Sequence, residues 1–168
     1  MKTDIFWIPG PWRGRLAIAA RPRGGDWLND EAEGWRRAGL DVVVSLLEDD
    51  EAAQFDLLDE RQAAEYRGIS FISFPIPDRG VPVSTREAVS LMARIAAELD
   101  AGKTVAVHCR QGIGRSGLIA AGVLVTSGKS PKEAIQTVSS ARGVAVPETL
   151  EQRRWTQRLP SLVWVVKS

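Results

Sequence analysis

The chain of 168 residues is 44% hydrophobic and 26% charged, which suits one globular domain over residues 1–168 with an adequate core. A formal net charge of +1 creates no long-range field, so nothing electrostatic favours binding to nucleic acid or to an anionic membrane surface. The single cysteine and single histidine exclude an internal disulfide and a structural zinc site of Cys and His ligands, and they favour a reducing compartment.

The first half of the sequence predicts two edge strands followed by alternating helices and strands. Apolar periodicity and turn residues indicate strands at 5–8 and 16–19, a helix ended by Gly39, a buried strand at 41–47, a helix from Asp56 to Arg67 and a strand at 69–75. Two charged groups interrupt this pattern. Arginines at 13, 15, 21 and 23 form a solvated surface or line the approach to an anionic substrate. The acidic residues 48–51 form a solvated turn or, less commonly, a metal site.

The second half predicts helices connected by one more strand. Ser84 and Glu87 form a capping box that begins an amphipathic helix ended by Gly102. The elements expected after it are a buried strand at 104–107, a buried helix at 116–125, a helix from Pro131 to Gly143 and a last helix from Pro147 that packs through Leu150 and Leu159. The tail around 162–166 is expected either as an edge strand or as surface packing. The order predicts an α/β domain with a central, mainly parallel sheet and helices on both faces.

The sequence His108-Cys109-Arg110-Gln111-Gly112-Ile113-Gly114-Arg115-Ser116 connects the last predicted strand to the buried helix. Two glycines let backbone amides turn toward one point, and an arginine follows the cysteine by six positions. Converging N–H groups at a helix N-terminus favour a bound phosphate, and the same field favours the thiolate form of the cysteine. The alternative is a buried, inert cysteine at the end of a strand.

The histidine, the cysteine, the arginine and the serine match in full the signature of the cysteine-dependent protein tyrosine phosphatase superfamily. The sequence resembles the compact dual-specificity type, which carries a general-acid aspartate on a mobile loop upstream of the cysteine. Asp78 matches that position in spacing and setting. The segment Pro75-Ile76-Pro77-Asp78 and the later helices are similar to the cyclin-dependent-kinase-associated phosphatase branch and its bacterial relatives, so the resemblance covers about 41–159.

The residues of the motif predict its chemistry. A Cys109 thiolate attacks phosphorus, while Arg115 grips two non-bridging oxygens in the transition state. Asp78 and Cys109 each follow one of two neighbouring parallel strands, so both belong to the same edge of the sheet. Asp78 protonates the leaving oxygen and later activates water. The expected phosphate-binding residues are Arg110, Gln111, Gly112, Ile113, Gly114 and Arg115.

Three further residues receive expected roles. The resemblance implies that Ser116 donates a hydrogen bond to the cysteine sulfur and that Gln152 positions the hydrolytic water. His108 is expected to support the loop structurally, because a loop that ionises the thiol itself needs no general base. The chemistry needs neither a metal ion nor a cofactor, and none is expected.

These residues predict a phosphomonoester hydrolase that forms a phosphocysteine intermediate, first of all a protein tyrosine or dual-specificity phosphatase. The resemblance gives a phosphoinositide or other small-phosphomonoester phosphatase as the second choice, because lipid phosphatases tend to carry two basic residues where this loop has only Arg110. An inactive phosphopeptide-binding module is the alternative of another class, but binding alone would require neither Cys109 nor Asp78. Sulfur transfer of the rhodanese type would give Asp78 no use.

The expected partners are phosphorylated proteins or peptides, not nucleic acid. The first residues, 1–7, lack the features of a signal peptide, and the longest apolar stretch, 118–125, is too short to span a bilayer. We therefore expect no membrane insertion and a soluble, cytoplasmic monomer.

Overall fold

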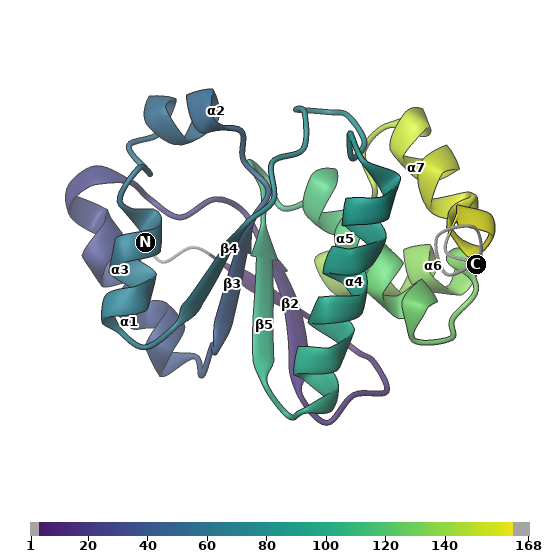
Figure 1. Cartoon of the computed structure of the whole chain (residues 1–168), viewed down its shortest axis with the longest axis horizontal. Helices are drawn as coiled ribbons and strands as arrows, with labels where there is room; N and C mark the ends of the chain where they lie inside the picture. Colours follow the sequence, from purple (N-terminus) through teal and green to yellow (C-terminus); the bar gives the residue numbers. More distant parts are fainter. Residues whose placement is uncertain (1–3, 163–168) are drawn as a thin grey trace.

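A computed structural model describes residues 4–162 and has a five-stranded sheet at its centre (Figure 1). The strands are β1 (Ile5–Ile8), β2 (Arg15–Ala19), β3 (Val42–Ser45), β4 (Ser70–Ser73) and β5 (Thr104–His108), in the spatial order β1-β2-β5-β3-β4. β1 pairs with β2 in antiparallel orientation, and the other three pairings are parallel. The expected mainly parallel sheet is confirmed.

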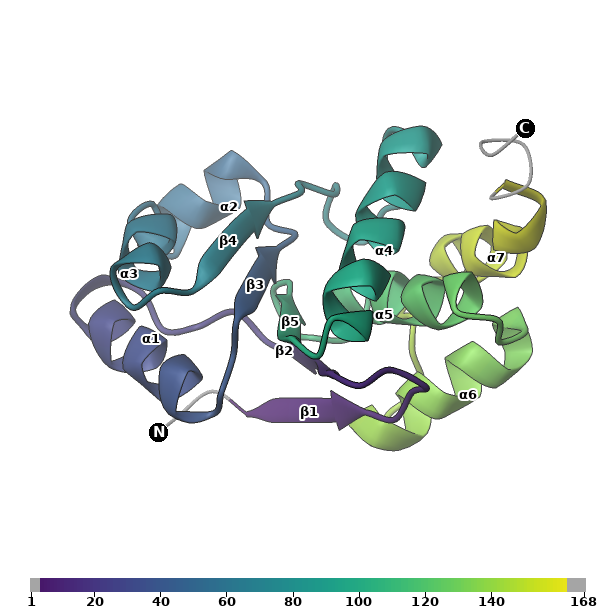
Figure 2. The ribbon, with the colours of Figure 1, turned by 60° about the horizontal axis from the view of Figure 1, so that its bottom comes forward.

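Helices cover both faces of this sheet, as the turned view makes plain (Figure 2). The helices are η1 (Gly25–Trp27), α1 (Leu28–Arg37), α2 (Asp49–Gln54), α3 (Glu60–Tyr66), α4 (Thr85–Asp100), α5 (Arg115–Thr126), α6 (Pro131–Arg142) and α7 (Leu150–Gln157). α1 and α3 lie on one face, and α4 to α7 lie on the other. None of the helices within residues 4–162 is long and apolar enough to cross a membrane.

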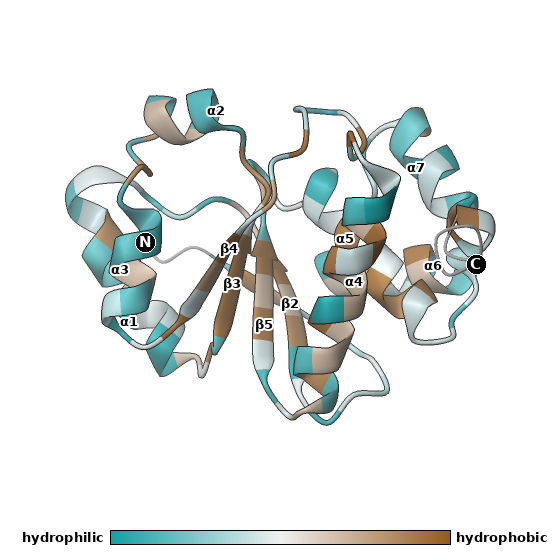
Figure 3. Ribbon diagram, viewed as in Figure 1, coloured by the Kyte–Doolittle hydropathy of each residue, from teal (hydrophilic) through white to brown (hydrophobic). Residues whose placement is uncertain are grey.

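Alternation along the strands creates two cores. Side chains at every second position of a strand face the same side, so Val42 and Val44 join the core beneath α4 and α5, whereas Val43 joins the core beneath α1 and α3. α5 is buried over most of its length, which explains why its sequence is apolar on all sides. Figure 3 shows this helix and the strands as hydrophobic, with more hydrophilic residues on the outer helices.

Four local predictions are wrong. The last helix, α7, begins at Leu150 with Thr149 as its N-cap, and not at Pro147. The acidic residues 48–51 begin α2, because Glu48 and Glu51 form a capping box instead of a solvated turn. Asp56 adopts a left-handed conformation with φ of 55°, and α3 begins only at Glu60. Leu150 is exposed, although Leu159 is buried as predicted. The part of the predicted tail at 163–166 lies outside the described residues.

Candidate active site

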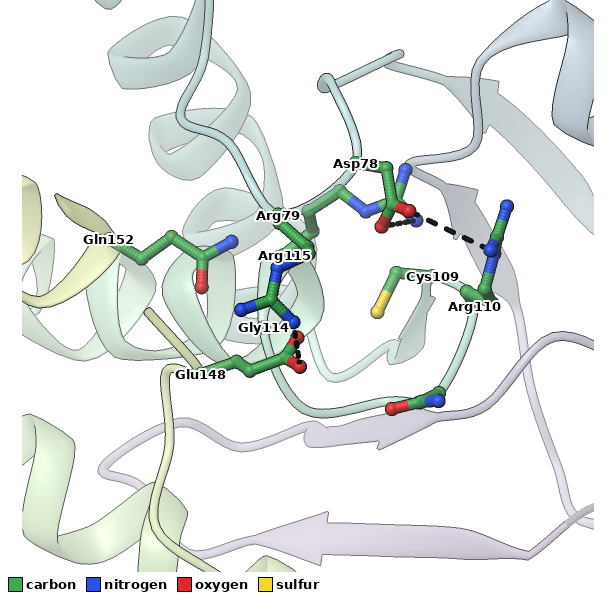
Figure 4. Close-up of a pocket in the computed structure, with 9 residues that line it drawn as sticks. Asp78, Arg79, Cys109, Arg110, Gly114, Arg115, Glu148 and Gln152 are labelled. Carbon is green, nitrogen blue, oxygen red and sulfur yellow. Dashed lines mark hydrogen bonds and ion pairs between the residues drawn. The ribbon is translucent and has the colours of Figure 1, made fainter. Parts of the chain in front are cut away.

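The cysteine loop, residues 109–114, connects β5 to α5 at the carboxyl end of the parallel strands. It forms one wall of a pocket of about 170 Å³, which is smaller than a typical drug-sized ligand site of about 300–1,000 Å³. The pocket is lined by Asp78, Arg79, Cys109, Arg110, Gln111, Gly114, Arg115, Glu148 and Gln152 (Figure 4). Its size and its polar lining suit a phosphate group.

The nucleophile candidate lies at the base of this pocket. Cys109 is 3% exposed, and its Sγ lies 3.2 Å from the Oγ of Ser116 in the first turn of α5. The sequence prediction that these two side chains meet is confirmed. The sulfur therefore lies in direct contact with the first turn of α5, where the cysteine loop ends.

The cysteine loop is shaped so that its amides are available to an anion. Gly112 has a φ of +72°, and a Cβ at this position would lie 2.6 Å from the carbonyl carbon of Ala19. Arg142 donates hydrogen bonds to the carbonyl oxygens of Gly112 (3.0 Å) and Gln111 (3.3 Å). Because N–H and C=O of a trans peptide point in opposite directions, the N–H groups that follow these carbonyls point away from Arg142. Within residues 4–162, no N–H of residues 110–114 donates a hydrogen bond to the protein.

Arg115 is held from several sides although it is only 2% exposed. Its Nη1 and Nη2 donate to the two carboxylate oxygens of Glu51, at 2.6 and 2.9 Å, and Nη1 also donates to the carbonyl oxygen of Ile76 at 3.0 Å. Burial acts to lower the pKa of Arg115. The hydrogen bond to Glu51 and the negative charges of Cys109, Glu51 and Asp78 outweigh burial and raise that pKa.

The buried partner of this arginine, Glu51, is a site residue that the sequence analysis missed. Burial acts to raise the pKa of its carboxyl, but hydrogen bonds from Arg115 and the Glu48 N–H, with the charges of Arg115 and Arg110, hold it below its ordinary value. Glu51 is therefore a buried counter-ion rather than a metal ligand. The capping-box spacing from Glu48 to Glu51 was the signal that placed this residue on a helix.

Asp78 lies on the loop of residues 74–84 that connects β4 to α4, which we call the Asp78 loop. Its Oδ1 accepts a hydrogen bond from Nη2 of Arg115 at 3.2 Å, and its Oδ2 lies 3.7 Å from Nη1 of Arg110. Figure 4 shows Asp78 over the pocket that contains Cys109. The prediction that the two residues share one edge of the sheet is confirmed.

The segment that leads into α7 closes the opposite wall. Gln152 is fully buried, accepts a hydrogen bond from the Thr149 N–H at 3.1 Å and donates from Nε2 to the carbonyl oxygen of Gly80 at 2.9 Å. Arg79 and Glu148, neither of them predicted as site residues, form an ion pair of 2.8 Å across the same wall (Figure 4). These contacts join α7 to the Asp78 loop.

His108 lies behind the cysteine loop, outside the pocket lining. Its Nε2 contacts the two carboxylate oxygens of Glu60 on α3 at 2.5 and 2.9 Å, and its Nδ1 lies 3.4 Å from the carbonyl oxygen of Cys109. Both side chains are buried. The ring thus connects the start of the cysteine loop to a helix on the other face of the sheet, and Glu60 is a further partner that the sequence analysis missed.

The four clustered arginines near β2 separate in space. Arg15 pairs in the sheet with Thr104, at the end of β5 that is farthest from the cysteine loop, and Arg13 precedes it. The Arg21 N–H, by contrast, donates to the carbonyl oxygen of Arg110 at 3.3 Å. Arg23 forms a 2.7 Å ion pair with Glu31. Of these four, only Arg21 directly contacts the cysteine loop among the described residues.

Comparisons with known proteins agree with this geometry. The family model described as "Polymorphic toxin system, DSP-PTPase phosphatase" matches residues 18–129. Cyclin-dependent kinase inhibitor 3 of Rattus norvegicus is 26% identical over an alignment of 127 residues that covers 74% of this chain and 59% of that protein. The chain spans less than two thirds of the length of the curated relatives that it matches.

Solved structures show the same fold. The crystal structure of kinase associated phosphatase has a TM-score of 0.88 at 19% identity, with 98% of this chain and 97% of that chain covered. The crystal structure of Tk-PTP in the active form has a TM-score of 0.72 at 33% identity, covering 88% and 92%. The family model matches from the end of β2 through α5, including Asp78 and the cysteine loop, and the chain belongs to the dual-specificity type of the cysteine-dependent protein tyrosine phosphatases.

Proposed function

We propose that this protein hydrolyses phosphate monoesters on proteins through a phosphocysteine intermediate. One observation carries the proposal. The Cys109 sulfur lies at the base of a phosphate-sized pocket where five consecutive amides, those of residues 110–114, have no partner within residues 4–162 and where Arg115 is held in a fixed orientation. Preorganised donors of this kind stabilise the charge of a phosphoryl-transfer transition state.

In the first step, the Cys109 thiolate attacks phosphorus, and the S–P bond forms as the P–O bond to the leaving group breaks. Asp78, protonated, transfers its proton to the leaving oxygen. Within the described residues, Nε of Arg115 has no hydrogen-bond partner, and Nη2 shares its remaining hydrogen with Asp78. The Nε–Nη2 edge therefore binds two phosphate oxygens when Asp78 moves to the leaving group.

In the second step, water attacks the phosphocysteine, and the Asp78 carboxylate takes the proton of the water. The S–P bond breaks, and its electron pair returns to the sulfur as the thiolate. The Oγ of Ser116, 3.2 Å from Sγ, donates a hydrogen bond that stabilises this leaving thiolate. Gln152 orients the water, since each end of its amide retains one unused hydrogen-bonding position.

The substrates are phosphorylated proteins or peptides, with phosphotyrosine and phosphoserine or phosphothreonine both accepted. The small, polar pocket takes the phosphate and leaves the rest of the substrate outside. PTPMT1, which resembles this chain with 18% identity and a TM-score of 0.73, has been crystallised in complex with PI(5)P. An inositol lipid is therefore the alternative substrate to compare with peptides. A monomer in a reducing, cytoplasmic compartment fits an enzyme that depends on one free thiol.

The decisive experiment measures steady-state turnover of an aryl phosphate, of phosphotyrosine and phosphothreonine peptides, and of a phosphoinositide. Wild-type enzyme should hydrolyse the aryl phosphate and the peptides. Cys109→Ser should be inactive but still bind phosphopeptide, because only the nucleophile is changed. Arg115→Lys should lose about a hundredfold in rate. Lipid turnover that exceeds peptide turnover would replace the protein substrate, and an active Cys109→Ser variant would refute the mechanism.

A further inference from the structure

The segment after β2 holds a cation at the edge of the site. The N–H of Arg21 donates to the carbonyl oxygen of Arg110 in the cysteine loop. On the other side, the Gly25 N–H donates to the carbonyl oxygen of Asp56 at 3.0 Å. A Cβ on Gly24 would lie 1.9 Å from the carbonyl oxygen of Phe55, so the two backbones are in direct contact. Residues 21–25 are therefore fixed between the cysteine loop and the end of α2.

Arg21 and Arg110 share one aromatic ring. The guanidinium carbon of Arg21 lies 3.9 Å from the centroid of the Phe55 ring, and that of Arg110 lies 5.1 Å from the same centroid. Stacking on an aromatic face holds a guanidinium while leaving its N–H groups available at the edges. The only hydrogen bond that Arg21 donates from its side chain within the described residues goes to the carbonyl oxygen of Pro22, at 3.3 Å.

The charges around the pocket are matched unevenly. Arg115 has Glu51 and Asp78, Arg79 has Glu148, and Arg110 has Glu51 and Asp78 at 3.3 and 3.7 Å. Within residues 4–162, no carboxylate pairs with Arg21. Among the described residues that contact the cysteine loop, Arg21 and Arg142 both lack a carboxylate partner, but Arg142 uses its guanidinium to donate to the carbonyl oxygens of Gly112 and Gln111. Arg21 is therefore the cation that remains available beside Phe55 and Arg110.

We propose that Arg21, stacked on Phe55 beside Arg110, forms a subsite for a carboxylate that flanks the phosphorylated residue of a peptide substrate. The inference rests on the proposed function and specifies its substrate class as acidic phosphopeptides. One unmatched guanidinium on an apolar ring suits a single Asp or Glu side chain, whose stem packs on the ring while its carboxylate meets the cation. A highly phosphorylated inositol ring would instead meet the acidic side chains Asp78 and Glu148 around the same pocket.

The test compares phosphotyrosine peptides that differ at one flanking position, which carries Glu, Gln or Lys and is moved through three positions on each side. The readout is the ratio of kcat/KM between the Glu and Gln peptides, measured alongside turnover of a small aryl phosphate. Wild-type enzyme should prefer Glu on one side of the phosphotyrosine by about two- to fivefold, the range for an exposed ion pair. The preference should fall as salt is raised.

Variants assign the preference to the residue. Arg21→Gln should bring the ratio to one, Arg21→Glu should favour the Lys peptide, and Arg21→Lys should retain part of the preference for Glu. Arg13→Gln is the matched control, since this exposed arginine lies toward the far end of the sheet and should keep the wild-type ratio. A ratio independent of residue 21 in enzymes that hydrolyse the aryl phosphate overturns the subsite alone. An enzyme inactive on every phosphate ester overturns the proposed function and the subsite with it.

Discussion

Arg115 on α5 and Glu51 on α2, 64 positions apart in the sequence, are joined by two parallel hydrogen bonds inside the protein. This bidentate pairing fixes the plane of the guanidinium as well as its position. The cost of burying Arg115 is thereby offset without using the Nε–Nη2 edge that the proposed mechanism assigns to phosphate. α2 thus acts as part of the site although it contributes nothing to the pocket lining.

Glu51→Gln should lower kcat by about ten- to a hundredfold, since a small misplacement of a transition-state contact has effects of this size. The amide can accept from only one guanidinium nitrogen well, so the plane of Arg115 is no longer fixed. Steady-state kinetics with an aryl phosphate measure the loss. Asp49→Asn, an exposed change on the same helix, is the control and should behave like wild type. Equal kinetics for the two variants would show that Arg115 needs no counter-ion.

Glu51 should also make stability depend on pH in the acidic range. Its pKa in the folded protein is below the ordinary value of 4.5, so its contribution is fully present above that pH and is lost as pH falls below it. The difference in the free energy of unfolding between wild type and Glu51→Gln should shrink as pH falls from 7 through this range. Urea unfolding at several pH values measures it. A constant difference would mean that Glu51 has the same proton affinity folded and unfolded.

The sequence was sufficient for the parts of the molecule where a local rule decides the structure. Alternating and buried apolar runs located the five strands found within residues 4–162, and the signature around Cys109 located the cysteine loop. The location of Asp78 and Cys109 at the same edge of the sheet followed from the rule that ligands bind at the carboxyl ends of parallel strands.

The residues that pair with the site residues could not be predicted, because only tertiary contacts bring the partners together. Nothing in the sequence distinguishes Glu51, Glu60 and Glu148 from glutamates on a protein surface. Each meets its partner only when the chain folds. For the same reason, the four arginines near β2 do not form one group in the structure. Arg13 and Arg15 lie at or just before the start of β2, and Arg21 lies just beyond its end. Arginines that are close in sequence are therefore at opposite ends of the sheet.

Asp78→Asn should remove the alkaline limb of the pH profile of kcat/KM. Wild-type enzyme needs ionised Cys109 and protonated Asp78, which gives a bell-shaped profile. The loss of rate in the variant should be large for alkyl phosphates and small for aryl phosphates with good leaving groups, because these need little protonation. An alkaline limb that persists in Asp78→Asn would assign the general acid to another residue.

Gln152→Ala should slow hydrolysis of the phosphocysteine more than its formation. Gln152 binds Gly80 and Thr149 through one donor and one acceptor, and its remaining donor and acceptor are assigned to the attacking water. With an aryl phosphate that has a good leaving group, rapid mixing should therefore reveal a burst of aryl product followed by a slow steady state. Gln157→Ala, an exposed change on the same helix, should show no burst. A Gln152→Ala enzyme slowed without a burst would limit Gln152 to holding the Asp78 loop.

Peroxide should inactivate the enzyme through Cys109, because thiolates oxidise faster than thiols. The chain has no second cysteine that could trap the sulfenic acid as an internal disulfide. An added small thiol should therefore restore activity after brief exposure but fail once the sulfinic or sulfonic state has formed. Phosphate or vanadate should slow the inactivation by filling the pocket above the sulfur. Mass spectrometry of the peptide that contains Cys109 measures each oxygen added to the sulfur. If this thiol survived peroxide that oxidises free cysteine, Cys109 would be an inert core residue, and the nucleophile of the proposed mechanism would have to be found elsewhere.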